Sequence, residues 1–140
     1  MSYFNTASVN GGLTLFSTAD QRINVDRQSV NNIINSPLGS YPSLQTNLIS
    51  SVWTDGNTID SNIWKNGNPQ GTIGTSAGLL SASSNLVIGN NFQNNINLQG
   101  SISEVIYFNT MLNTNDRRIV ECYLSSKYNI SLNQLSSVCN

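Results

Sequence analysis

Residues 100–130 read GSISEVIYFNTMLNTNDRRIVECYLSSKYNI, and no other part of the chain carries so dense a structural pattern. The first third of this stretch alternates apolar residues over both faces of an extended segment, with Ile102, Ile106 and Phe108 on one face and Val105 and Tyr107 on the other. A strand that is apolar on both faces is typical of a central position with a layer on each side. The pattern therefore predicts a central strand, covered by an opposing sheet and by the helix that follows.

A single amphipathic helix is predicted directly after this strand, over about residues 113–128. Asn113 is a good N-cap, and Asp116 three residues later makes a variant of the capping box. Lys127 in the last turn suits the helix dipole, and Asn129 suits a left-handed C-cap. The apolar stripe expected to be buried recurs at helical spacing and consists of Ile119, Val120, Tyr123, Leu124 and Tyr128.

Glu104 is a carboxylate among the apolar neighbours of the predicted strand. Arg117 and Arg118 stand in the first helical turn, where the helix dipole disfavours cations. We therefore expect one of these two arginines to pair with Glu104 and to fix the helix to the sheet. The alternative is that Glu104 lies near the strand end and is solvated. Either interpretation is structural rather than catalytic.

The rest of the chain reads as short strands separated by polar turns. Asp55-Gly56 and Asn66-Gly67 are turn signals, and the second is the strongest hairpin signal of the sequence. Strand patterns lie at residues 13–17, 22–30, 48–53, 58–65 and 86–89. Irregular structure is expected in a lead-in, two surface loops and a C-terminal tail, at residues 1–12, 31–46, 90–97 and 131–140.

The 140 residues suit one domain without internal repeats. Six basic and seven acidic residues are scattered along the chain and leave a net charge of −1. Neither nucleic acid nor an anionic membrane is an expected partner, because binding to either requires a basic surface. No apolar run approaches the ~20 residues of a membrane span, and the N-terminus lacks the pattern of a secretory signal.

Cys122 and Cys139 are the two cysteines, and the chain has no histidine. A zinc site is therefore not expected. The cysteines could form a disulfide between the helix and the tail, or remain free as in proteins assembled in a reducing cytosol. Free thiols are the expectation.

Three pieces of the sequence resemble laminin-G-like domains, which are concanavalin A-like jelly rolls. These pieces are Asn47–Trp53 (NLISSVW), Ile63–Gly67 (IWKNG), and Leu86–Gly89 (LVIG) together with the pattern of residues 100–128. Only the third is specific. The resemblance implies an all-β fold, an antiparallel β-sandwich over residues 1–140 with one C-terminal helix at about 113–128.

The chain is short for that family on its N-terminal side. A sandwich without its early strands exposes an edge, and proteins cover or pair such edges. We therefore expect the edge to pair with another subunit or with residues 1–12. An oligomer, or a component docked on a larger assembly, follows from this expectation.

An enzyme is not expected. The chain has no histidine for a catalytic triad and no glycine-rich phosphate loop. The related glucanases use closely spaced carboxylates on one strand, and glycoside hydrolysis needs such a pair. The nearest acidic pairs of this sequence, Asp55 with Asp60 and Asp20 with Asp26, belong to turns, where solvated carboxylates are common.

The resemblance also implies a candidate ligand site, since laminin-G-like folds often bind sugars or calcium at a loop rim. The aromatic platform and polar partners of a sugar site could come from Trp64, Tyr41, Asp55, Asn57, Asn90 and Asn91. Trp53 and Trp64 lie on predicted strands, however, where core or subunit packing is the commoner role. Calcium is a weaker alternative, because a hard cation needs about six oxygens. No other cofactor is expected.

The sequence therefore predicts a non-enzymatic structural or interaction module at an exterior surface, as a decoration or fibre component of a virion capsid or tail. Its expected partners are copies of itself or other subunits of an assembly. The alternative is a lectin-like module that binds a surface glycan in adhesion, outside or on the surface of a cell.

Overall fold

The computed structural model describes residues 3–6, 13–17, 23–27, 30–39, 41, 45–54, 57–70, 72–73, 86–88, 100–133 and 139. Side chains are described from Ser36 onward, apart from residues 53–54, 57–61, 72–73 and 86–87. The elements in chain order are β1 (Tyr3–Thr6), β2 (Leu13–Ser17), β3 (Ile23–Arg27), β4 (Val30–Asn35), β5 (Ile49–Thr54), β6 (Asn57–Lys65), β7 (Asn68–Pro69), β8 (Thr72–Ile73), β9 (Leu86–Ile88) and α1 (Thr114–Tyr128).

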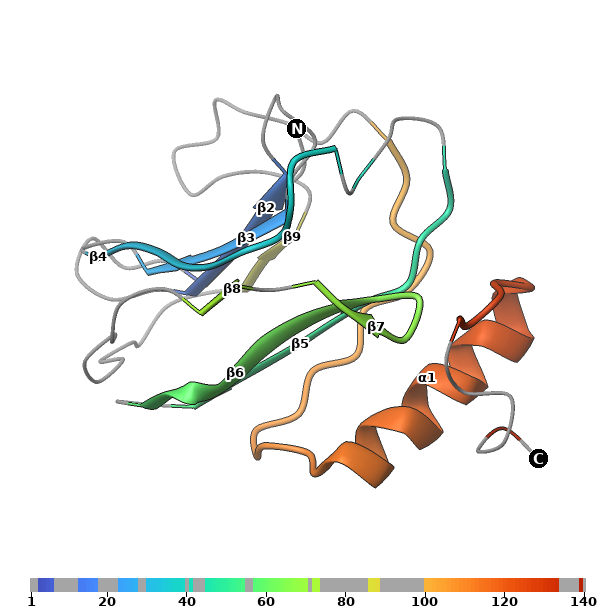
Figure 1. Cartoon of the computed structure of the whole chain (residues 1–140). Helices are drawn as coiled ribbons and strands as arrows, with labels where there is room; N and C mark the ends of the chain where they lie inside the picture. The colour runs from blue at the N-terminus through green and yellow to red at the C-terminus, as the bar shows by residue number, and fades with distance from the viewer. Residues whose placement is uncertain are drawn as a thin grey trace.

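The strands form two antiparallel sheets. The larger sheet has the order β8-β4-β3-β2-β1-β9, and the smaller has the order β5-β6-β7. Strand β6 approaches β4 and β8 of the larger sheet. Figure 1 shows the smaller sheet between the larger sheet and α1, with the C-terminus beside the helix.

Most strand positions agree with the sequence pattern. The strand at Leu13–Ser17 is confirmed, and β5, β6 and β9 lie within one or two residues of their predicted bounds. The lead-in was predicted to be irregular, but it contains β1, which pairs with both β2 and β9. Residues 3–6 of the lead-in therefore form a strand beside β2.

The loop predicted over residues 31–46 is wrong in its first part, because β4 extends from Val30 to Asn35. Its β-branched residues favour a strand, and the asparagines between them do not prevent pairing with β3. The loop predicted over residues 90–97 and the turn predicted at Asp55-Gly56 lie outside the described residues.

The hairpin predicted at Asn66-Gly67 is confirmed. Strands β6 and β7 pair through Lys65 and Asn68, so that only two residues form the turn. Both have positive φ angles, 49° at Asn66 and 82° at Gly67. A two-residue hairpin turn of this kind requires positive φ at both positions, and asparagine followed by glycine meets that requirement at the least cost.

Asn66 also joins this turn to the beginning of β5. Its backbone N–H donates to the Leu48 carbonyl at 2.9 Å, and its Oδ1 accepts from the Leu48 N–H at 2.8 Å. The Asn66 carbonyl accepts from the N–H of Asn133, beyond the helix, at 3.1 Å. Leu48 and Ile63 are the buried hydrophobic residues among the described side chains, so this turn stands at the edge of the described core.

Both predicted caps of α1 are confirmed. Asn113 is the N-cap, and its Oδ1 accepts from the backbone N–H groups of Asn115 and Asp116 at 2.9 Å each. The amide of Asn113 also donates to the Asp116 carboxylate at 2.6 Å. Asn129 closes the helix in the left-handed conformation, with φ 52°. The helix ends are therefore determined by side chains within one turn of each end.

The predicted buried stripe of α1 is wrong in part. Ile119 is 61% exposed and Tyr123 is 51% exposed, whereas Arg117 and Glu121 are the buried residues of the helix. Arg117 and Glu121 can take the place of apolar residues at the contact with β6 because their opposite charges form an ion pair. The helix therefore contacts β6 through an ion pair.

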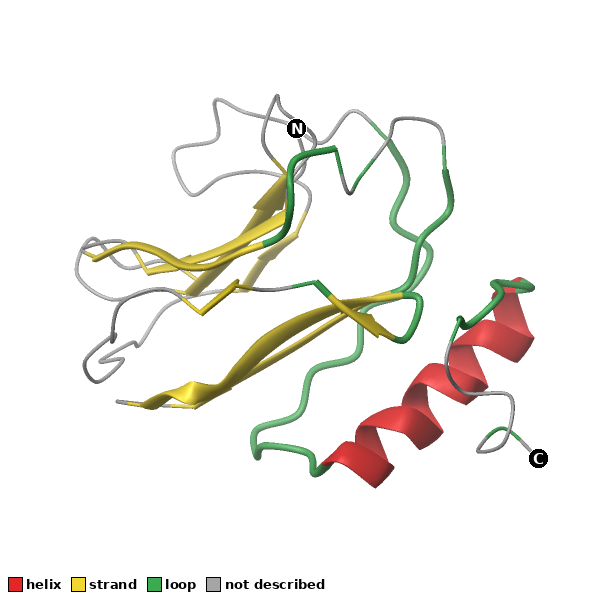
Figure 2. Cartoon of the chain, viewed as in Figure 1, coloured by secondary structure: helices red, strands yellow, loops and turns green. Residues whose placement is uncertain are grey.

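The predicted central strand is wrong. Residues 102–108 are irregular, as Figure 2 shows, and within the described part of the chain they pair with no strand. Their apolar side chains are 37% to 70% exposed. The alternating pattern identified an apolar segment correctly, but no strand of the described residues pairs with it.

The predicted jelly-roll β-sandwich is therefore also contradicted. A sandwich requires a shared core between two sheets, and among the described side chains only Leu48 and Ile63 are buried hydrophobic residues. The unit that the described side chains establish is the three-stranded antiparallel sheet with one helix against it.

Candidate functional site

The contact between α1 and β6 is centred on Trp64 and Arg117. The guanidinium carbon of Arg117 lies 3.9 Å from the centre of the Trp64 ring, and its Nη1 donates to the Glu121 carboxylate one helical turn later. Arg117 is 6% exposed and Glu121 is 1% exposed. The ring, the cation and the carboxylate thus form one cluster between helix and sheet, in which Arg117 and Glu121 are buried.

Three polar atoms of the described residues are buried without a hydrogen-bond partner. They are Glu121 Oε2, Arg118 Nε and the Tyr41 hydroxyl. A buried polar atom without a partner destabilises a protein by about 1–3 kcal/mol. Glu121 offsets this cost through the pairing of its other oxygen with Arg117.

Glu104 belongs to a second cluster at the C-terminal end of α1. It accepts from Lys127 Nζ at 3.1 Å and from the Tyr128 hydroxyl at 2.9 Å, and Lys127 also donates to the Tyr123 hydroxyl at 3.0 Å. The hydrogen bonds from Lys127 and Tyr128 hold the pKa of Glu104 below its usual value. The hydrogen bonds that Lys127 donates to Tyr123 and Glu104 raise the pKa of Lys127, and the bond that Tyr128 donates to Glu104 raises the pKa of Tyr128.

The predicted pairing of Glu104 with Arg117 or Arg118 is therefore wrong. Glu104 pairs with Lys127, and Arg117 pairs with Glu121. The reason is geometric: Glu104 lies beside the last turn of α1, at the opposite end of the helix from the two arginines of the first turn. The contacts of Glu104 with Lys127 and Tyr128 therefore join the segment before α1 to the end of α1. They do not join α1 to a sheet.

Glu121 was not singled out from the sequence. The signal was present, since Arg117 and Glu121 are four residues apart and four-residue spacing places side chains together on a helix. The same spacing relates Tyr123 to Lys127. What the spacing does not show is which of these pairs faces the sheet.

The structure describes only part of the predicted ligand site. Tyr41 lies near Lys65, whose Nζ is 5.0 Å from the centre of the Tyr41 ring, and burial raises the pKa of the Tyr41 hydroxyl. Trp64 and Lys65 alternate along β6 and therefore point to opposite faces. Among the described contacts, the Tyr41 ring is joined to Lys65 and the Trp64 ring to Arg117.

The other predicted ligand residues are not placed as side chains. Asn57 begins β6 opposite Thr54, but only its backbone is described, as is also true of Trp53 and Asp60. The remaining three, Asp55, Asn90 and Asn91, lie outside the described residues.

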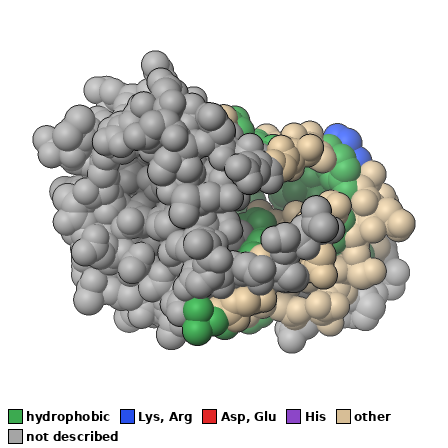
Figure 3. All heavy atoms as spheres, turned by 90° about the horizontal axis from the view of Figure 1, so that it is seen from above, with side chains coloured by type: hydrophobic (Ala, Val, Ile, Leu, Met, Phe, Trp, Pro, Cys, Tyr) green, Lys and Arg blue, Asp and Glu red, His purple; other side chains and the backbone are tan. Residues whose placement is uncertain are grey.

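Most of the exposed large hydrophobic residues of the described chain lie just before α1. We call residues 102–108 the 102–108 segment; it exposes Ile102, Val105, Ile106, Tyr107 and Phe108. Met111 and the helical residues Ile119 and Tyr123 are also more than half exposed. Seen from above, hydrophobic side chains reach the surface of the described part beside a lysine or arginine (Figure 3).

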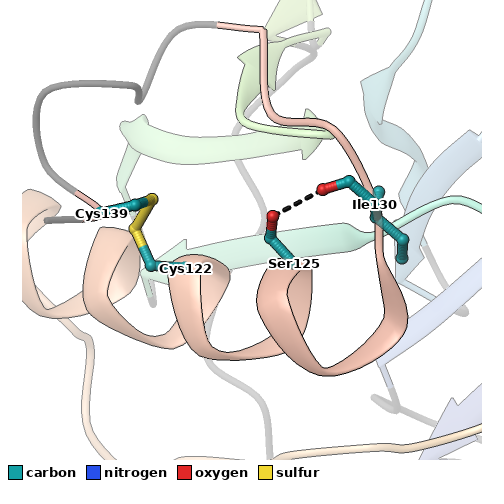
Figure 4. Close-up of a disulfide and its surroundings, with 4 residues drawn as sticks. All are labelled: Cys122, Ser125, Ile130 and Cys139. Atoms are coloured by element: carbon teal, nitrogen blue, oxygen red, sulfur yellow. Dashed lines mark hydrogen bonds between the residues drawn. A yellow bond between two sulfur atoms is a disulfide. The ribbon is translucent and has the colours of Figure 1, made fainter.

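Cys122 and Cys139 form a disulfide, so the expectation of free thiols is wrong. Their Cα atoms are 5.3 Å apart, and the bond ties the C-terminal tail to the middle of α1 (Figure 4). The tail turns back over the helix at Ile130, whose carbonyl accepts from the Ser125 hydroxyl at 2.5 Å (Figure 4). The sequence left this pairing open because two cysteines 17 residues apart can either form a disulfide or remain free thiols.

The described residues contain no group of three or more His, Cys, Asp or Glu side chains that could hold a metal ion. Nor does the described part include a helix with the length and apolarity to cross a membrane. Comparison with family models, with curated proteins and with solved structures found no match for this chain.

Proposed function

We propose that this chain is a non-enzymatic structural and interaction module of an exterior surface, as a decoration or fibre component of a virion. The observation that carries the proposal is the exposed 102–108 segment. Exposed contiguous apolar surface on a soluble domain is typical of a protein–protein contact. A module whose main surface feature is such a segment acts by binding another protein.

The disulfide supports the exterior location. Disulfides persist in oxidising surroundings, which include secreted proteins and the surfaces of cells and virions, and are rare in a reducing cytosol. The bond between Cys122 and Cys139 is also a local staple, since it fastens the tail to the helix. Such a staple suits a small domain that must survive outside a cell.

A lectin-like module, the alternative from the sequence, has less support. A sugar platform needs an aromatic ring with a free face, and the Trp64 ring is half-buried and faces the Arg117 guanidinium. Glycan-array screening of the purified chain tests this alternative directly. We expect no specific binding; a specific glycan signal would favour the lectin instead.

Particle association tests the proposed function. Particles released by the source are separated on a density gradient, and each fraction is probed for the chain. We expect the chain in the particle fraction, accessible to antibody on intact particles, with Cys122 and Cys139 resistant to a thiol label until a reductant is added. A chain found only in the soluble fraction would contradict the proposal.

A further inference from the structure

We infer that the 102–108 segment pairs with the same segment of a second copy of this chain, as two antiparallel strands related by a two-fold axis. The inference rests on the proposed function, because it names the partner of the surface that the proposal uses. It commits to a dimer with Val105 at its centre.

The backbone of the segment is available for pairing. The structure places no strand beside residues 101–108 within the described chain. Four of its residues are β-branched or aromatic within the run Val105–Phe108, which favours an extended conformation. An extended apolar segment with unpaired backbone groups is a template for pairing with another chain.

The exposed apolar area is sufficient for a dimer. With about 200 Å² for a large apolar residue, the exposed fractions of Ile102, Val105, Ile106, Tyr107 and Phe108 amount to roughly 500 Å². Met111, Ile119 and Tyr123 add roughly 300 Å² more on the same estimate. A standard interface buries about 800 Å² on each partner.

These flanking residues adjoin the segment. Lys127 Nζ contacts Glu104 at 3.1 Å and the Tyr123 hydroxyl at 3.0 Å, so Tyr123 lies next to the centre of the segment. Ile119 lies one helical turn before Tyr123 on the same face of α1. The apolar surface therefore continues from the segment onto the helix.

Electrostatics permits association of two copies. The chain has a net charge of −1, so mutual repulsion is weak. The only charged residue within the 102–108 segment is Glu104, and Lys127 and Tyr128 already satisfy its carboxylate. Pairing of two copies therefore does not bring bare carboxylates into an apolar contact.

Symmetry and side-chain chemistry select one register. A two-fold axis perpendicular to an antiparallel pair passes through one residue, which then faces its own copy. With Val105 on the axis, Ser103 faces Tyr107 and Ile102 faces Phe108, and an aromatic residue opposite a β-branched one, as in the second of these pairs, stabilises a pair of strands. An axis through Glu104 would place two carboxylates opposite each other, which is unfavourable.

Sedimentation equilibrium of the full chain tests the dimer. We expect a concentration-dependent monomer–dimer equilibrium. The dissociation constant of the dimer should be at least about 100-fold larger in Val105→Lys, because this change places two like charges face to face. Leu38→Lys is the matched control, since Leu38 is 66% exposed but lies on the loop after β4. Circular dichroism establishes that each variant is folded. A wild-type monomer at all concentrations, or a folded Val105→Lys that still dimerises, would overturn the inference.

Cysteine cross-linking tests the register. Val105→Cys is expected to form a disulfide with its own copy under mild oxidation, because directly opposed residues bring their Cα atoms within the range of a disulfide. Ser103→Cys and Tyr107→Cys are expected to cross-link when mixed and not when alone. Peptide mapping by mass spectrometry distinguishes these bonds from exchange with Cys122 and Cys139. Self-linking of Ser103→Cys rather than Val105→Cys would overturn the register.

The two experiments separate this inference from the proposed function. A chain that sediments with particles but is monomeric after purification leaves the proposed function standing and refutes the dimer. A purified dimer that never accompanies a particle refutes the proposed function and leaves the pairing itself established.

Discussion

The guanidinium of Arg117 lies 3.9 Å from the centre of the Trp64 ring, and this contact fastens the first turn of α1 to the last residues of β6. A cation over an aromatic ring contributes about 2 kcal/mol when it is removed from water. The contact also explains why an arginine occurs in a helical turn where the dipole disfavours it. Glu121, one turn later, supplies the compensating charge.

The first prediction concerns this buried ion pair. Glu121→Leu leaves the Arg117 guanidinium buried without its carboxylate, and we expect the free energy of unfolding to fall by about 3 kcal/mol. The double variant Arg117→Met with Glu121→Leu removes both charges and should regain most of that loss, since an apolar pair of similar volume can replace an ion pair. Urea denaturation measures both. A double variant that is less stable than Glu121→Leu would show that the charges do not act as a pair.

The second prediction concerns pH. Glu104 has a folded pKa below its usual value of 4.5, so its contribution to stability is present above that pH and is lost as the pH falls through the lower folded value. Lys127 has a folded pKa above 10.5, so its contribution is present below that pH and is lost at higher pH. We expect Glu104→Gln to lower the melting temperature slightly between pH 4.5 and pH 10.5. In acid, the melting temperatures of the variant and the wild type should converge.

Melting curves of the wild type and Glu104→Gln from acid to neutral pH provide the measurement. Asp116→Asn is a comparison at the other end of α1: it removes a carboxylate that contacts Asn113, so any loss that it causes reports on the helix N-cap rather than on the pair of Glu104 and Lys127. A constant difference between wild type and Glu104→Gln across the acid range would refute the linkage.

The third prediction concerns the disulfide. Cys122→Ser combined with Cys139→Ser should lower the free energy of unfolding by about 3 kcal/mol, the amount typical of a bond across a short loop. The cysteines are 17 residues apart. Calorimetry with and without a reductant measures the effect. The reductant should destabilise the wild type and leave the double variant unchanged, and equal responses would show that the bond contributes nothing.

The fourth prediction concerns the turn at Asn66. Asn66→Ala removes the acceptor of the Leu48 N–H and places alanine at positive φ, which together should destabilise the chain by about 2 kcal/mol. Asn66→Asp keeps an acceptor and tolerates the left-handed conformation, so its loss should be smaller. Urea denaturation ranks the two variants. An Asn66→Asp as unstable as Asn66→Ala would argue against the bond to Leu48.

Local features of the fold were predictable from the sequence. The caps of α1 and the Asn66-Gly67 turn depend on residues within a few positions of one another, and their side-chain chemistry is specific. Strand β2 was recognised for the same reason, because the residue types of Leu13–Ser17 are typical of a strand. The early strand β1 and the later part of β4 were missed, because asparagine-rich surroundings concealed them.

The candidate sites were less predictable. Glu104 was expected to pair with Arg117 or Arg118, whereas Glu104 pairs with Lys127 and Arg117 pairs with Glu121. The sequence places charges on an element without showing which neighbouring element will face them. The disulfide shows the same limit, since two cysteines 17 residues apart can meet only if the chain turns back after the helix.

What the sequence by itself determined is the set of local structures: a capped helix, a two-residue hairpin and an apolar segment before the helix. Backbone preference and side-chain hydrogen bonds over a few residues suffice for each of these. Only the tertiary structure decided that the helix rests on β6 through Arg117 and Trp64, that Glu104 pairs with Lys127, and that the 102–108 segment stays exposed. The reason is that burial and charge pairing depend on contacts between residues far apart in the chain, which no local pattern encodes.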